Sequence, residues 1–361
     1  MESARPITIV GGGPVGLVLA CLLGQRGRSV SILEKSTQLP TSSMAIGITP
    51  PSLEVLQELG LRKEFESRGV QISRAQVFEE GRWCGALEFR PSEKRILSFP
   101  QFGTVQILRG KVGQLPTVHL HEGMEATPEG LEACKGWVIG CDGAHSRVRE
   151  WAGISSERKE YSARFVMADF PDEEQLGSDA RLYFSANGAV ESFPLPGKRR
   201  RWVTQRVGAA DASLDTIIDR VGAATGIDLR GREHGPVNGF HPSRSLAQHY
   251  WRDQVILCGD AAHTLSPIGG QGMNTGIADA KHLAEVLMNP SEGALHQYEQ
   301  ARKRAFRIAS RRAACGMWLG TRTGSMASGL RKYFLQAALA LPIAQKKLVT
   351  TFAMKDLPAV G

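Results

Sequence analysis

Three glycines near the start of the chain have a spacing that suits phosphate binding. Gly11, Gly13 and Gly16 follow the apolar run at 7–10 and precede an apolar stretch typical of a helix. In this pattern the first glycine permits a tight turn, the second lets the backbone approach a pyrophosphate, and the third allows a helix to pack closely on a strand. The helix N-terminus then supplies free N–H groups and a positive dipole end. Pro14 and Val15 lie in the same turn and belong to the predicted site.

An acid follows at the end of the next predicted strand, residues 30–35. Glu34, with Lys35 beside it, stands eighteen residues beyond Gly16. At this position a carboxylate can bind the ribose hydroxyls of an adenine nucleotide. The alternative is a glycine-rich turn without a ligand. Because the strand, the helix and the acid occur in register, we expect a dinucleotide site, although this motif alone does not separate NAD from FAD.

Two further segments carry polar residues directly after apolar strands. Residues 136–149 reach Asp142 and then a basic helix start, which taken alone is equally well an ordinary strand and turn. Residues 254–287 deliver Asp260 and a loop with Pro267, Gly270 and Gly272, and a helix begins near Met273 and Asn274. The helix N-terminus after this loop predicts a second anion site, for which a dehydrogenase with one nucleotide site has no need.

Taken in this order, the three segments resemble the class A flavoprotein monooxygenases, the p-hydroxybenzoate hydroxylase-like family. The resemblance covers about residues 7 to 300. It implies bound FAD, with NADPH or NADH as a transient co-substrate, and oxygenation of an aromatic or polycyclic, lipophilic small molecule by dioxygen through a flavin hydroperoxide. Hydroxylation and epoxidation both remain open, in a setting such as bacterial secondary metabolism.

The resemblance also implies roles for individual residues. The three glycines would hold the FAD pyrophosphate and Glu34 the adenosine ribose. Arg109 falls where the family places an arginine that contacts FAD, and Asp142 matches the acid that serves FAD and NAD(P)H. Asp260 would bind the ribityl chain. The segment Gly272, Met273 and Asn274 would lie against the pyrimidine edge of the flavin, where a helix dipole stabilises the reduced, anionic form by about 0.5–2 kcal/mol.

The sequence departs from the family pattern in two places. Met44 stands where many members have an arginine near the flavin, and the interval between Arg109 and Asp142 is short. We also do not expect the thioredoxin-like extension of the larger relatives. The W-x-W-x-I-P signature of the flavin-dependent halogenases is absent from the sequence. We therefore expect a monooxygenase rather than a halogenase.

The expected architecture is α/β, with a Rossmann-type FAD-binding domain of discontinuous segments, an inserted β-sheet substrate domain and a helical C-terminal region. We assign residues 1–71, 109–160 and 250–300 to the FAD domain and 72–108 and 161–249 to the substrate domain. Residues 301–361 form the basic helical region. Candidate pocket residues of the substrate sheet are Phe165, Met167, Tyr183, Phe184 and Phe193, with Arg181, Arg206, His241 and Arg244 as polar candidates. For each of these, a core or surface role is the simpler interpretation, and we assign no general base. His263 is expected to be structural.

The net charge of +8 is concentrated near the C-terminus of the sequence. Between Arg302 and Lys355 there are twelve basic residues and no Asp or Glu. A solvated helical face is the simpler explanation, and peripheral contact with anionic lipid is the alternative. Nucleic acid is not expected as a partner, because no binding fold or aromatic platform is present.

The six cysteines form no C-x-x-C pair or zinc-type spacing, so we expect no metal site. Unpaired cysteines in apolar surroundings suit a reducing cytoplasm, and no apolar run is long enough to span a membrane. Two alternatives of other classes stay open. One is an FAD-dependent reductase or dehydrogenase of a prenyl-type substrate, and the other is a non-catalytic FAD-binding subunit.

Overall fold

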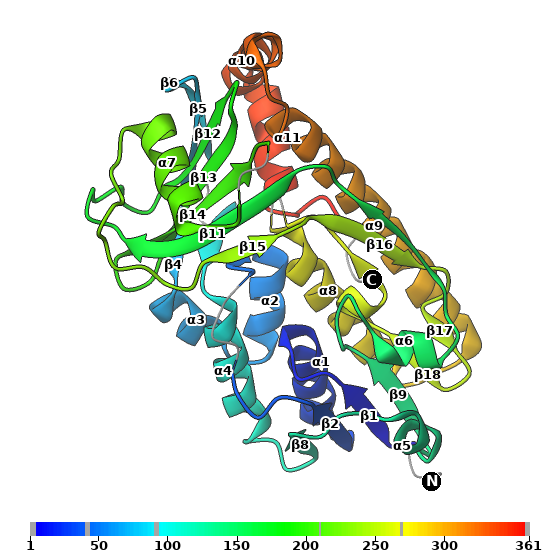
Figure 1. Cartoon of the computed structure of the whole chain (residues 1–361). Coiled ribbons are helices and arrows are strands. Elements are labelled where there is room, and N and C mark those ends of the chain that lie inside the picture. The colour runs from blue at the N-terminus through cyan, green and yellow to red at the C-terminus, as the bar shows by residue number, and fades with distance from the viewer. Residues whose placement is uncertain (1–4, 40–43, 90–93, 209–210, 268–269, 358–361) are drawn as a thin grey trace.

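The computed structural model describes residues 5–39, 44–89, 94–208, 211–267 and 270–357. Two large sheets stand at opposite ends of the molecule, and a long helix runs along one side from the first sheet toward the second (Figure 1). This arrangement confirms the predicted α/β class, with a Rossmann-like sheet, a further sheet and helices toward the C-terminus.

The first sheet has six strands, of which five are parallel. Its three central strands β1, β9 and β18 are apolar, because the interior of a parallel sheet is covered on both faces. Their order across the sheet is β17 (Trp251–Arg252), β18 (Val255–Leu257), β9 (Trp137–Gly140), β1 (Ile7–Val10), β2 (Val30–Glu34) and β8 (Val118–Glu122). β1, β9 and β18, which lie side by side, come from the three segments that carry the sequence motifs.

Helices from distant parts of the chain cover this sheet. α1 (Pro14–Gln25) is almost entirely buried and packs against α4 (Gln101–Val112) and α8 (Gln271–Val286). The same core contains residues of α2 (Pro50–Glu58) and α3 (Arg62–Arg68), which are separated by a turn at Gly60, where φ is +76°. The domain boundary that we expect at 108/109 falls inside α4. That helix packs as a unit on α1, because its apolar residues Val105, Ile107 and Leu108 belong to the first core.

The second sheet has seven strands. Their order is β15 (Asn238–Phe240), β11 (Arg164–Pro171), β14 (Arg199–Arg206), β13 (Gly188–Leu195), β12 (Ala180–Ser185), β5 (Arg74–Glu79) and β6 (Arg82–Glu88). Because side chains alternate between the faces of a strand, the sheet has two different surfaces. One surface, with Val166, Tyr183 and Trp202, packs against α7 (Leu214–Thr225).

The opposite surface of the second sheet faces the C-terminal helices. α9 (Glu292–Gly320) brings Met317 against Phe165, Met167 and Val203. α10 (Ser325–Ala340) and α11 (Pro342–Phe352) cover the β5–β6 end with Leu339 and Val349. We call this surface, opposite α7, the inner face.

Smaller elements connect the two large sheets. One three-stranded sheet contains β10 (Ser156–Glu160), β16 (Ser243–Ala247) and β19 (His263–Thr264), and another contains β3 (Gly47–Ile48), β7 (Ile96–Ser98) and β4 (Val70–Ile72). The short helices α5 (Pro128–Glu132) and α6 (Arg147–Trp151) flank β9. No helix in the described ranges is long and apolar enough to cross a membrane.

Candidate cofactor site

The glycine turn after β1 is closed on one side and open on the other. Gly11 has φ +108°, and a β-carbon there would lie 2.4 Å from the carbonyl oxygen of Cys141. At Gly16 a β-carbon would lie 2.1 Å from the carbonyl oxygen of Gly11. At Gly13, by contrast, a β-carbon would meet nothing within 4 Å. Gly11 and Gly16 are therefore required by packing, whereas Gly13 borders open space.

That open space lies at the N-terminus of α1. The helix begins at Pro14, and none of the side chains that the structure describes caps it. Its first turn contains no acidic residue. The free N–H groups and the positive end of the helix dipole therefore remain available to an anion such as a pyrophosphate.

Glu34 lies at the end of β2, beside this turn. Its two carboxylate oxygens accept hydrogen bonds from the backbone N–H groups of Gly12 (2.7 Å) and Ser36 (2.9 Å). Lys35, next along the chain, is exposed. Arg109, on α4, forms an ion pair with Glu122, which is the register partner of Glu34 on β8. The structure therefore brings Arg109 to the same end of the sheet as Glu34. The Nε atom of Arg109 is buried and has no partner in the described ranges.

The three sequence motifs meet around Val15. A β-carbon at Gly259 would lie 3.0 Å from a methyl carbon of Val15, and a β-carbon at Gly276 would lie 2.6 Å from one. Gly259 belongs to the third segment, and Gly276 lies in α8. The second segment joins them, because the Cys258 N–H donates to the carbonyl oxygen of Gly140 (2.9 Å). Segments more than 100 residues apart thus form one continuous surface.

Asp142 follows β9 and Asp260 follows β18, which are neighbouring strands of the first sheet. One oxygen of Asp142 accepts a hydrogen bond from the Val148 N–H at 3.1 Å, whereas the other is buried and lacks a partner among the residues that are described. Asp260 follows β18 in a 3-10 turn, and its side chain is exposed. Desolvation by the surrounding protein nevertheless raises the pKa of Asp260. Both acids retain an oxygen that can accept a hydrogen bond from a ligand.

The N-terminus of α8 lies where the sequence predicts a second anion site. Gly270 precedes the helix with φ +64°, and within the described part of the chain no side chain caps it. Gly272 faces open space, and Met273 is half-buried against the first core. Pro267 is exposed, and Gly269 of the same loop lies outside the described residues.

Asn274 has a positioning role that sequence reasoning missed. Its side chain accepts a hydrogen bond from the Thr49 N–H (2.9 Å) and donates to the carbonyl oxygens of Gly47 (2.8 Å) and Gly270 (2.7 Å). Only 2% of the residue is exposed. Asn274 therefore fixes residues 47–49 against the start of α8, where we predicted a direct contact with flavin.

Behind this surface lies a closed ionic cluster of His263, Asp279 and Arg302. Asp279 binds His263 Nε2 at 2.6 Å and Arg302 Nε at 2.5 Å, and it accepts the Gly259 N–H at 3.2 Å. Burial by itself would raise the pKa of Asp279, but the two partners outweigh it and lower that pKa to about 2. His263 is thus structural, as expected. Asp279 and Arg302 carried no motif that reveals their pairing.

The candidate substrate residues divide between the two faces of the second sheet. Phe165, Met167 and Phe193 lie together on the inner face. Tyr183 lies on the other face, where it stacks on Phe78 at a ring distance of 4.7 Å. Phe184 packs under Gly320 at the end of α9. Of the polar candidates, Arg244 contacts Ser310, and His241 bonds to the carbonyl oxygen of Tyr161.

Comparison with known proteins identifies the family. A family model described as an FAD binding domain matches residues 5–313. Rifampicin monooxygenase of Streptomyces venezuelae is 28% identical over 321 residues, which are 82% of this chain and 67% of that protein. Para-nitrophenol 4-monooxygenase of a Pseudomonas species is 25% identical over 344 residues, 85% of this chain and 84% of that protein.

Solved structures show the same fold. The crystal structure of p-nitrophenol 4-monooxygenase from Pseudomonas putida has a TM-score of 0.85 at 22% identity and covers 98% of both chains. Anhydrotetracycline hydroxylase from Streptomyces rimosus has a TM-score of 0.78 at 24% identity, covering 98% of this chain and 76% of that one. The chain therefore belongs to the FAD-binding-domain family of class A flavoprotein monooxygenases.

Proposed function

We propose that this protein is a monooxygenase that uses NAD(P)H and dioxygen to hydroxylate or epoxidise an aromatic or polycyclic, lipophilic small molecule on bound FAD. The observation that carries the proposal is a pair of helix N-termini, those of α1 and α8, that no described side chain caps and that lie on one surface built from three distant segments. One such end suits a pyrophosphate. The second suits the negative charge that a flavin acquires on reduction.

The residues of this surface fit FAD. Gly13 leaves room for the pyrophosphate over α1, and Glu34 lies at the strand end where the adenosine ribose would bind. Asp260 would accept hydrogen bonds from the ribityl hydroxyls, and Gly272 leaves room beside the start of α8. The buried, unpartnered oxygen of Asp142 is a further acceptor for the cofactor or for NAD(P)H. Bound FAD would supply the electron transfer and the oxygen chemistry, and the protein would orient the reactants.

The inner face of the second sheet supports an aromatic substrate. Phe165, Met167, Val203 and Phe240 are apolar and lie on that face, and Phe165 stacks on Phe240 at a ring distance of 5.4 Å. Arg201 of the same face donates to the carbonyl oxygen of Met44 at 3.1 Å. Asn274 holds the nearby Gly47 and Thr49 to α8. The apolar face is therefore tied to the segment where we place the flavin ring.

The test is anaerobic reduction of the FAD-loaded protein by NADPH or NADH with a panel of phenols and polycyclic aromatics. We expect flavin bleaching that is faster with a suitable ligand, followed in air by oxygen uptake coupled to an oxygenated product. Reduction with no oxygenated product would support the reductase alternative. Absence of NAD(P)H-driven reduction with every ligand would support the non-catalytic alternative.

The proposal includes peripheral contact with anionic lipid through α10. The outward side chains of this helix are Met326, Leu330, Tyr333 and Phe334, which are 82%, 69%, 74% and 60% exposed. This spacing places them on one helical stripe, and the following helix, α11, carries the exposed lysines Lys346 and Lys347. Aromatic and apolar side chains with adjacent cations suit the surface of an anionic bilayer.

Vesicle sedimentation at low salt tests this contact. We expect the protein to sediment with phosphatidylglycerol vesicles but not with phosphatidylcholine vesicles, and the double variant Leu330→Ser, Phe334→Ser to stay in solution. Equal recovery of wild type and double variant in the supernatant would contradict lipid contact. A concentration-dependent dimer that the same variant abolishes would assign the stripe to a second copy of the chain.

A further inference from the structure

Glu191 is an ionisable side chain in apolar surroundings at the centre of the inner face. It lies on β13, opposite Leu182 of β12 and Val203 of β14. Met167 lies one strand further across the sheet, on β11, because it pairs with Val203. Phe193, two positions along β13, points to the same face. Directly opposed side chains lie about 4.5–5.5 Å apart at their β-carbons, so the nearest cross-strand neighbours of the carboxyl group are apolar. The diagonal neighbours on β14 are Arg201, which is paired with Asp169, and Gln205, which donates to the carbonyl oxygen of Thr321.

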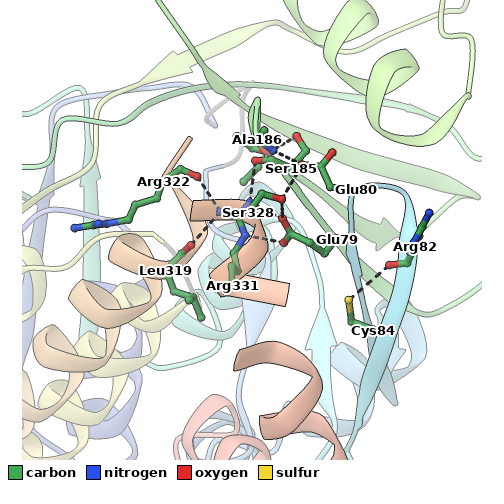
Figure 2. Close-up of polar contacts among 12 residues, drawn as sticks. Glu79, Glu80, Arg82, Cys84, Ser185, Ala186, Leu319, Arg322, Ser328 and Arg331 are labelled. Carbon is green, nitrogen blue, oxygen red and sulfur yellow. Dashed lines mark hydrogen bonds and ion pairs between the residues drawn. The ribbon is translucent and has the colours of Figure 1, made fainter. Parts of the chain in front are cut away.

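A second carboxylate on the same face shows how this fold treats a buried acid. Glu79 of β5 receives two bonds from Arg331, Nε to Oε2 at 2.7 Å and Nη2 to Oε1 at 2.8 Å, and one from the Ser328 hydroxyl at 2.5 Å. Figure 2 shows Arg331 and Ser328 of α10 pointing at Glu79. These bonds offset the cost of removing the charge from water. Glu79 therefore needs no partner from outside the chain.

Glu191 has no such arrangement. Within the described ranges it has neither a hydrogen-bonding nor an ion-pairing partner, and its side chain remains partly accessible although protein surrounds it. Desolvation raises the pKa of Glu191 to about 7. A desolvated acid without a partner is costly to the fold. Such groups are concentrated at functional sites.

The position of Glu191 relates it to the candidate flavin site. Val203, its neighbour on β14, is two residues from Arg201, and Arg201 binds Asp169 at 2.7 Å and the Met44 carbonyl oxygen at 3.1 Å. The segment that begins at Met44 reaches Gly47 and Thr49, which Asn274 holds to the start of α8. Glu191 therefore belongs to the part of the inner face that is tied to this helix end.

We propose that Glu191 is a specificity-determining residue, which accepts a hydrogen bond from a neutral hydroxyl or amino group on an otherwise apolar aromatic substrate. The inference rests on the proposed function, because it places the substrate on the inner face. An apolar pocket by itself discriminates weakly between similar molecules, whereas a buried acceptor rejects an analogue that lacks the donor. Above neutral pH the ionised carboxylate also disfavours aromatic acids, whose negative charge it would repel.

The test compares 2-naphthol with 2-methoxynaphthalene, which keeps the ring system but has no donor. Binding to the FAD-loaded protein is measured by perturbation of the flavin absorption spectrum and by calorimetry. We expect wild type to bind the naphthol at least tenfold more tightly than the ether. In Glu191→Leu the ratio of the two dissociation constants should fall to about one, because the affinity for the naphthol decreases while the affinity for the ether stays unchanged. In Glu191→Gln the preference should persist, but the pH dependence near 7 should disappear.

Glu157→Gln is the matched control, because Glu157 is an exposed acid on β10, which belongs to a different sheet from the inner face. This variant should behave as wild type. An unchanged ratio in Glu191→Leu would overturn the proposal, and so would a wild type that binds neither probe while NADPH still reduces its flavin. A third outcome separates the two claims. If the preference for the naphthol depends on Glu191 but neither NADPH nor NADH ever reduces the flavin, the proposed function is contradicted and this inference is retained.

Discussion

The two ends of α8 differ in how their polar groups are satisfied. In the second half of the helix, Asp279 binds His263, Arg302 and the Gly259 N–H, and it is fully buried. At the N-terminus, Gly270 and Gly272 leave the helix end uncapped among the described residues, and a β-carbon at Gly272 would meet nothing within 4 Å. Buried charges are normally paired, and helix ends are normally capped. The closed cluster therefore stabilises the fold, whereas the open helix end is where we propose that a ligand binds.

The closed cluster should show the largest effect on stability. We expect Asp279→Asn to lower the free energy of unfolding by about 3–5 kcal/mol, because it leaves the Arg302 charge buried without its partner. Urea denaturation measures the change. Asp356→Asn is the control, since the Asp356–Arg312 pair is partly exposed and is worth about 0–1 kcal/mol. Similar losses in both variants would contradict the distinction between closed and exposed pairs.

Asp279 also predicts a pH dependence of stability in acid. Its pKa in the folded protein, about 2, lies below the ordinary value of 3.8. The stabilisation from the ionised carboxylate is therefore fully present above about pH 4 and is lost as the pH falls through 2. Wild type should lose stability across this range, and Asp279→Asn should lose less.

Glu191 should have the opposite pH dependence. Because its pKa rises from 4.5 to about 7 on folding, the unfolded chain releases this proton first, and stability falls as the pH rises from about 4.5 to 7. One pKa unit corresponds to 1.36 kcal/mol, so Glu191→Gln should stabilise the protein at pH 8 by at most about 3 kcal/mol. Denaturation at pH 5 and pH 8 measures this difference. A gain that is equal at both pH values would show that ionisation is not its cause.

Substitutions at Gly16 and Gly13 of the first turn distinguish an effect on packing from an effect on cofactor binding. Gly16→Ala should cost about 1–3 kcal/mol of stability, because its β-carbon would collide with the Gly11 carbonyl oxygen. Gly13→Val should change stability by less than about 0.5 kcal/mol. It should weaken FAD binding at least tenfold, about 1.4 kcal/mol, because the side chain enters the open space over α1. Fluorescence titration with FAD, together with denaturation, distinguishes the two effects. If Gly13→Val binds FAD as tightly as wild type, the pyrophosphate does not bind at this turn.

The glycine turn, the flanking strands and the start of α8 could be predicted from sequence because each is a local pattern. The family and the α/β class followed from their order along the chain. The Asp279–Arg302 contact could not be predicted, because the two residues lie 23 positions apart on different helices and no sequence pattern links them. The run of basic residues near the C-terminus predicts one charged face, either solvated or lipid-binding. Two of its members, Arg302 and Arg331, are instead buried with Asp279 and Glu79. Glu191 lacked any sequence signal, because its isolation depends on which strands lie beside it.

A crystal structure of the protein with bound FAD tests the central claim most directly. The account predicts a single FAD whose pyrophosphate lies over Gly13 at the start of α1 and whose flavin ring lies between the start of α8 and the inner face, with Asp260 on the ribityl chain. A structure in which Gly13 and Asp260 contact different molecules, or in which the flavin ring lies away from α8, would contradict it.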